Sequence, residues 1–264
     1  MPDPTLDKTD QHVKCFRTCR RQPWGAGIGV AAAVPLSISL LSGQLASAVQ
    51  AGLSFEQKTG IHIKHYESQG RTLVEAVLDL AYEYRLPVAL EYLDRDAVRK
   101  PLQVNLHDAS VREVLTALVV EMPVYRMTFS SGMVDVYSPS ARNDPSNLLN
   151  DTIGDFTVKD ADPMYASVQL WGALSVKLHP GQGYGGDFAP LGGSVKVTID
   201  LRGAKVYQIL NAIVSQQGDC MWVVRLPPTG LSSFRGDMWY LYSLDPHWKE
   251  IVLSDAHSLF PSLK

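Results

Sequence analysis

The chain is poor in cysteine and has no excess of basic residues. Only three of its 264 residues are cysteines, and two of them, Cys15 and Cys19, lie within the first twenty residues. If that segment is removed, Cys220 alone remains, which excludes an internal disulfide framework. Cys220 opens an apolar run, so we expect a buried and unreactive thiol. The formal net charge is −3, so few cations are available for phosphates, and we expect no nucleic-acid partner.

Common enzyme signatures are also lacking. The chain has no G-x-S-x-G, H-E-x-x-H or P-loop pattern. The hexapeptide GQGYGG (181–186) fits G-x-G-x-x-G, but a helix is predicted before it and a strand after it, the reverse of a dinucleotide site. His62 and His65 lie three residues apart in a predicted strand, which points them to opposite faces with no third ligand nearby. We therefore expect no catalytic residue, no cofactor and no metal.

The first 51 residues have the order of a secretory signal peptide. Basic residues come first: Lys14, Arg17, Arg20 and Arg21. An apolar run (25–41) follows, and then small residues that allow cleavage after Ala48 or Ala51. A membrane anchor is the alternative, but the run is short, rich in Gly and Ala, and interrupted by Pro35. We expect a bacterial protein of the periplasm or cell envelope, without a membrane span after cleavage.

One phrase of sixteen residues occurs twice. VNLHDASVREVLTALV (104–119) aligns without a gap on IDLRGAKVYQILNAIV (199–214). Each copy begins with alternating apolar residues, which predicts a strand, and continues with an apolar stripe at helical spacing. The identical pairs are Leu106/Leu201, Ala109/Ala204, Val111/Val206, Leu115/Leu210, Ala117/Ala212 and Val119/Val214. The phrase therefore predicts two copies of one strand–helix unit.

The surroundings of the phrase are also repeated. The first copy is followed by strand-like runs at 125–129 and 133–138, and the second by runs at 220–226 and 238–244. Upstream, a capping box at Thr72 and Glu75 predicts a helix, and the Asp162-Pro163 pair predicts its counterpart. Further strands are predicted at 87–93 and 155–158. These elements make two βαββαββ-like units of an α/β (α+β) fold, each with two helices on short mixed sheets.

The expected domain organisation follows from these units. It comprises a signal peptide (1–51), a first unit (52–139), a linker (140–150) in the polar stretch 138–147 with its two prolines, a divergent second unit (151–245) and a C-terminal tail (246–264).

The first unit resembles the short N-terminal domain of secretins and TonB-dependent receptors. Residues 70–139 carry the resemblance: a T-L-x-x-A-like helix, a strand with an acidic-basic turn, a V-x-L-x-D-A-S-V-R-E-x-L-like strand and helix, and a closing hairpin. The second unit is similar only in its core phrase. The resemblance implies a compact periplasmic module that docks onto another protein, and it implies no catalytic residue.

A docking surface is predicted along the hairpin edges. The run Val134–Tyr137 is predicted as an outer strand with one charge, Asp135, which leaves it open to pairing with a partner strand. The candidate partner-binding residues, from this hairpin and from its counterpart at 220–244, are Val134, Asp135, Val136, Tyr137, Trp239 and Tyr240. The expected partner is an envelope protein. The alternative is a periplasmic ligand-binding protein or enzyme with its site between the units, under the Gly-rich loop 181–193.

Overall fold

The computed structural model describes residues 52–92, 97, 99–178, 195–225, 239–245 and 249–250. All of these residues belong to one compact unit, Leu40–Lys264. The predictions for the signal peptide, for the Gly-rich segment 181–193, for the insertion at 227–237 and for most of the C-terminal tail lie outside the described residues. The fold is α+β, with helices packed on small sheets.

The first repeat contains four strand-forming runs besides its opening strand, with helices between them. Its elements are α2 (Phe55–Thr59), β1 (His62–Glu67), α3 (Leu73–Tyr84), β2 (Val88–Tyr92), β3 (Asn105–Ser110), α5 (Val111–Val120), β4 (Arg126–Ser130) and β5 (Met133–Tyr137). The capping box predicted for α3 is made: the Glu75 amide donates to the Thr72 hydroxyl at 3.3 Å, and the Thr72 amide donates to the Glu75 carboxylate at 2.8 Å. Ser110 and Glu113 make the same box at α5.

The second repeat follows a short connection made of α6 (Pro139–Asn143) and the 3-10 turn η1 (Leu148–Asn150). Its elements are β6 (Thr152–Ala161), α7 (Pro163–Leu178), β7 (Val197–Lys205), α8 (Val206–Gln217), β8 (Cys220–Arg225) and β9 (Trp239–Ser243). Helix α8 has half of a capping box: the Lys205 amide donates to Gln208 Oε1 at 2.8 Å, but the Lys205 ammonium has no acceptor to offer in return.

The duplication predicted from the sequence is structural. In both repeats the opening strand pairs antiparallel with the strand of the repeated phrase, β1 with β3 and β6 with β7. Asp108 and Gly203 hold the same place and both have positive φ, 48° and 58°. The matching cross-strand pairs are His62–Ser110 and Thr152–Lys205, Ile63–Ala109 and Ile153–Ala204, His65–His107 and Asp155–Arg202, Tyr66–Leu106 and Phe156–Leu201, and Glu67–Asn105 and Thr157–Asp200.

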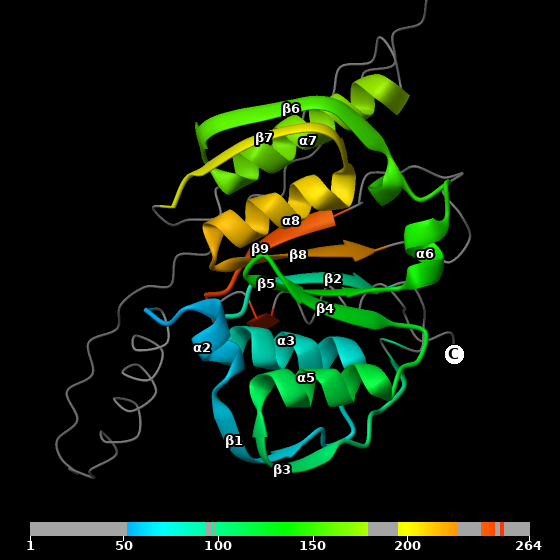
Figure 1. Cartoon of the computed structure of the whole chain (residues 1–264). Helices are drawn as coiled ribbons and strands as arrows, with labels where there is room; N and C mark the ends of the chain where they lie inside the picture. The colour runs from blue at the N-terminus through cyan, green and yellow to red at the C-terminus, as the bar shows by residue number, and fades with distance from the viewer. Residues whose placement is uncertain are drawn as a thin grey trace, which may run out of the picture. The chain divides into compact units, whose positions relative to one another are not determined.

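The two repeats share one sheet, which the sequence did not predict. Its five strands have the order β4-β5-β2-β8-β9, and parallel pairing of β2 with β8, from Val88 opposite Met221 to Tyr92 opposite Arg225, joins the repeats. In Figure 1, α3 and α5 lie on one side of this sheet and α8 lies on the other. The expectation of a separate small sheet for each unit is therefore corrected: the central sheet belongs to both.

Because helices cover both faces of this sheet, alternate residues of a strand enter different cores. On β8, Met221 and Val223 pack in the core of the first repeat, whereas Trp222 and Val224 pack in the core of the second. This explains why the β8 sequence, CMWVVR, is apolar at successive positions: strands that are buried on both faces lose the alternation of half-exposed ones. Cys220 is fully buried at the start of this strand, as predicted.

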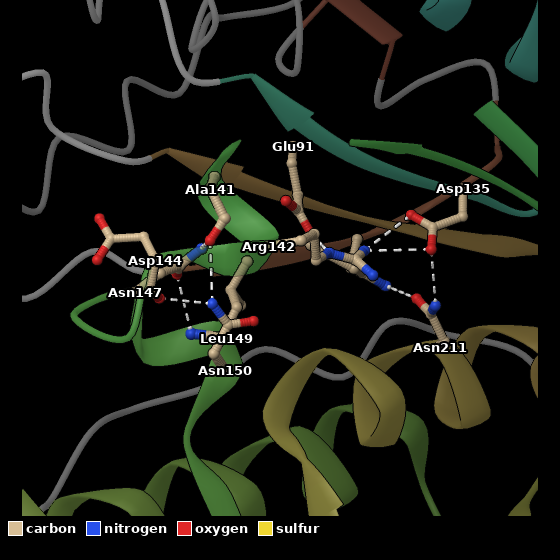
Figure 2. A network of polar contacts seen from close by, with 10 residues as sticks. Glu91, Asp135, Ala141, Arg142, Asp144, Asn147, Leu149, Asn150 and Asn211 are labelled. Carbon is tan, nitrogen blue, oxygen red and sulfur yellow. Dashed lines mark hydrogen bonds and ion pairs between the residues drawn. The ribbon is translucent and has the colours of Figure 1, made fainter. Parts of the chain in front are cut away.

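The segment predicted to be a polar linker is folded. Leu148 and Leu149 are buried in the core of the second repeat. The side-chain amides of Asn147 and Asn150 both donate to the carbonyl of Ala141, at 3.0 and 2.9 Å (Figure 2). The prolines and polar residues here make a short helix and a tight turn instead of a free linker.

Candidate functional site

A groove runs along the first repeat between β3 and α5, and we name it the first groove. It has a volume of about 810 Å³. On its strand side it is lined by the successive residues 103–109, and on its helix side by Arg112, Glu113, Thr116, Ala117, Val120 and Glu121.

The strand side of the first groove is a backbone edge. A strand that presents one face lines a groove with every second residue, but here consecutive residues of the strand all line the groove. Among the described residues β3 pairs with β1 alone, so its other edge carries unpaired peptide groups. On the helix side, Ala117 is half-buried and Val120 is 70% exposed, which leaves an apolar wall facing this edge.

Two charged side chains on the rim of the first groove are held in place by their neighbours. Arg112 donates to the Glu56 carboxylate at 2.8 Å, and its guanidinium lies 4.2 Å from the centre of the Phe129 ring. Glu113 closes the capping box of α5, and hydrogen bonds from the amide and hydroxyl of Ser110 lower its pKa. Both side chains are therefore structural parts of the wall.

The second repeat has a groove at the corresponding place, between β7 and α8, which we name the second groove. It is smaller, about 580 Å³, and the turn residue Ser131 of the first repeat also lines it. Its other lining residues each match one in the first groove: Leu201, Arg202, Gly203, Ala204, Gln208, Asn211, Ala212 and Ser215. Ser215 stands where the first groove has Val120, so the second groove lacks the exposed apolar wall.

A buried polar cluster joins the two repeats, and we name it the junction cluster: Glu91, Asp135, Arg142, Asn211 and Trp222 (Figure 2 shows the first four). The Arg142 guanidinium donates to Glu91 Oε1 at 2.6 Å and to both oxygens of Asp135 at 3.0 and 3.1 Å. Asn211 donates to Asp135 at 3.2 Å and accepts from the Trp222 indole at 2.8 Å. Glu91 is 0% exposed and Asp135 is 5% exposed.

The junction cluster exists because the repeats share a sheet. Glu91 on β2 and Asp135 on β5 occupy the strand faces that point away from α3 and α5, and α8 of the second repeat covers those faces. Two carboxylates are thereby removed from water, a change that is costly unless a cation replaces the solvent. Arg142, from the connection between the repeats, supplies that cation and also stacks on Tyr207, 3.7 Å from the ring centre.

The ionisation of the cluster reflects this burial. Loss of solvent raises the pKa of Glu91 to about 7, even though Arg142 acts in the opposite direction. Burial likewise raises the pKa of Asp135. Perturbed carboxylates can mark an active site, but none of Glu91, Asp135 and Arg142 lines either groove. The arrangement suits a structural lock between the repeats better than contact with a substrate.

A third cavity, of about 460 Å³, lies where the two repeats meet at the end of α8. It contains Lys58, whose ammonium donates to the Arg85 carbonyl at 2.8 Å, and burial lowers the pKa of this lysine. Arg85 in turn binds Asp219 of the second repeat through two nitrogen atoms. These charges are engaged with one another, and they form a second tie between the repeats.

The docking edge predicted at 134–137 is wrong. Strand β5 lies between β4 and β2, and the Val134 amide donates to the Pro87 carbonyl at 2.9 Å. Val134, Val136 and Asp135 are buried, so they offer no surface to a partner. Tyr137 is half-buried, with the Arg142 guanidinium 4.6 Å from its ring centre. The hairpin itself was predicted correctly, but its second strand is covered by β2.

The counterpart hairpin is different, because β9 is the last strand of the sheet among the described residues. Trp239 and Tyr240 lie on β9, paired with Val224 and Val223. The placement of their side chains lies outside what the structure describes.

His62, His65 and His107 are exposed. His65 and His107 lie opposite each other on β1 and β3 with stacked rings, 4.6 Å between centres. Among the residues that the structure describes, no group of three or more His, Cys, Asp or Glu side chains could hold a metal ion.

Of the two features that were missed, the groove wall had a signal in the sequence and the junction cluster had none. Val120 extends the apolar positions of α5 beyond the predicted stripe, and an exposed valine at the end of a helix marks the groove wall. Asp135, between two core valines, gave no signal for burial, because its cover comes from the other repeat.

No protein-family model, no curated protein and no solved structure matches the chain. Among the described helices, none combines the length and the apolar character needed to cross a membrane.

Proposed function

We propose that the protein is an exported, non-enzymatic interaction module of the bacterial cell envelope, and that the first groove binds an extended segment of a partner protein. The resemblance of residues 70–139 to the docking domain of secretins and TonB-dependent receptors supports this proposal. The basic, apolar and small-residue order of the first 51 residues supports export. N-terminal mass spectrometry of the protein from its host should find a chain that starts near Val49 or Gly52.

The observation that carries the proposal is the pairing of an open strand edge with an exposed apolar wall. A strand edge supplies amides and carbonyls that bind any extended backbone, and an adjacent pocket selects its side chains. In the first groove, the edge of β3 supplies the backbone groups, and Ala117 with Val120 supplies the apolar pocket wall. A peptide that pairs with β3 would place alternate side chains against this wall.

The charges on the rim indicate what flanks those apolar side chains. Asp108 and Glu121 are exposed carboxylates that line the groove; Asp108 also lies 3.4 Å from the His62 imidazole, and Arg112 is paired with Glu56. We therefore propose a partner segment with an apolar residue for the wall and a basic residue near it. The basic residue adds selectivity and association rate more than affinity, since exposed ion pairs are weak.

The test is a capture experiment with matched variants. Envelope extract of the host is passed over the immobilised protein, and bound proteins are identified by mass spectrometry. Val120→Glu places a charge on the apolar wall and should abolish capture of the specific partner. Two controls should retain it: Ser215→Glu at the matching position of the second groove, and Val124→Glu, a 52% exposed valine that does not line the groove.

The outcomes separate the possibilities. Loss of capture with Val120→Glu alone supports the first groove. Equal capture by all three variants places the contact elsewhere and contradicts the groove assignment. Failure of the unchanged protein to retain any partner, together with turnover of a small molecule, would contradict the interaction function itself.

A further inference from the structure

The second repeat is incomplete among the described residues. Each strand and helix of the first repeat from β1 to β5 has a counterpart in the second, except β2. Strand β2 stands between α3 and β3. The corresponding place in the chain is between α7 and β7, and the described residues there, up to Leu178 and from Val195, include no such strand.

The place that this missing strand would occupy is known from the first repeat. There, β2 pairs parallel with β5, the second strand of the hairpin. The hairpins match through their registers, because Phe129 lies opposite Val134 as Val224 lies opposite Trp239. Strand β9 is therefore the counterpart of β5, and the site is the outer edge of β9, where no described strand pairs.

The backbone of β9 is oriented to receive such a strand. The Leu244 amide donates to the Asp219 carbonyl at 3.1 Å, so this position faces β8. Because neighbouring residues of a strand point their peptide groups to opposite sides, Trp239 and Leu241 face the outer edge. In the first repeat the residue that matches Trp239 is Val134, whose amide binds the Pro87 carbonyl just before β2.

Helix α7 is also less covered than its counterpart. Val74, Leu78 and Tyr82 of α3 are buried in a core that contains β2 and the residues after it. The positions that match them on α7 are Met164, Val168 and Gly172, and all three are partly exposed. A Cβ added to Gly172 would meet no atom within 4 Å. Among the described residues, this part of α7 and the outer edge of β9 thus lack the cover that β2 gives in the first repeat.

We propose that an extended segment of another protein binds parallel to the outer edge of β9 and takes the place that β2 holds in the first repeat. Its chemistry is that of β2, with apolar side chains at alternate positions, like Val88 and Leu90, directed toward the helices. At the corresponding point of the sequence, residues 181–193 include six glycines and Pro190, and both residue types are depleted in strands. This site is separate from the first groove and does not depend on it.

The test uses the strand of the first repeat as the probe. A fluorescent peptide with the sequence LPVALEYL (residues 86–93), followed by two lysines for solubility, is titrated with the full-length chain and followed by fluorescence anisotropy. Trp239→Pro removes an outward amide of β9 and should weaken peptide binding at least tenfold. Trp239→Val keeps that amide and should bind the peptide like the unchanged protein. Met127→Pro, which alters the opposite edge of the same sheet at β4, should also leave binding unchanged.

Three results would overturn the proposal. The first is that the peptide does not bind the unchanged protein. The second is that the peptide binds Trp239→Pro as tightly as Trp239→Val. The third is that light scattering shows a dimer of the unchanged protein that Trp239→Pro dissociates, because the occupant of the edge would then be a second copy of this chain. Val120→Glu should bind the peptide normally, so that failure at β9 and failure of the first groove are told apart.

Discussion

The two repeats have the same strand registers but differ in how they begin their helices and in what they leave open. In the first repeat α3 and α5 both start with complete capping boxes, whereas α8 has half of one. The first groove has an apolar wall, and its counterpart has Ser215 in the same place. Among the described residues, the second repeat has the same framework as the first but no counterpart of β2, and no described strand pairs with the outer edge of β9.

The comparison also shows how two modules become one body. A strand face that would meet water in a single module becomes internal when α8 covers it, and the residues on that face must change or find partners. Ala89 is apolar and packs in the second core, whereas Glu91 and Asp135 kept their charges. Arg142 stabilises those charges from the connection between the repeats, so the connection is part of the interface.

The largest expected effect comes from removing the cation of the junction cluster. Arg142→Ala leaves two carboxylates buried without a counterion, which should lower the free energy of unfolding by about 3–5 kcal/mol. Urea denaturation followed by tryptophan fluorescence measures this change. The control is Arg112→Ala, where a more exposed arginine loses an exposed glutamate and the cost should stay near or below about 1 kcal/mol. Similar losses in both variants would mean that the junction cluster does not hold the repeats together.

A smaller effect, with a defined pH dependence, is expected at Glu91. Its pKa in the folded protein is about 7, above the ordinary value of 4.5, so folding favours the protonated form. The stabilisation is complete below about pH 4.5 and is lost as the pH rises through 7, by about 3 kcal/mol in total. Glu91→Gln removes this dependence.

Urea denaturation of both proteins at pH 5 and pH 8 measures the effect. Relative to the unchanged protein, Glu91→Gln should be more stable at pH 8 than at pH 5. A stability difference that is the same at both pH values would show that Glu91 stays ionised throughout, with Arg142 offsetting its burial.

The smallest effects test the difference between the helix starts. Ser110→Ala removes the cap of α5 and should lower the free energy of unfolding by about 1 kcal/mol. Lys205→Ser gives α8 the hydroxyl that its half-box lacks and should raise it by about 0.5–1 kcal/mol. Thermal unfolding of the two variants decides the point, and a destabilising Lys205→Ser would mean that its ring contact with Tyr207 contributes more than a cap does.

Local features of the fold were predictable, and long-range ones were not. The capping box at Thr72 and the repeated phrase with Leu115 and Leu210 predicted helices, strands and their buried faces, because these signals lie within a few residues of one another. The pairing of β2 with β8 leaves no local trace, since either strand could have been the edge of its own sheet. The candidate site failed at β5 for a similar reason: the strand was placed correctly, but its parallel pairing with β2 of the same repeat also leaves no local trace.

The parallel pairing of Val88 with Met221 also determines the order in which parts of the chain can fold during synthesis. Because a polypeptide is synthesised from its N-terminus, β2 is complete long before β8 is made. Until the second repeat folds, Glu91 and one edge of β2 therefore remain exposed to solvent. Contacts between such distant residues form slowly because loop closure must come first. During that interval the incomplete protein exposes an unpaired strand edge, and a chaperone that covers this edge would lower the risk of aggregation.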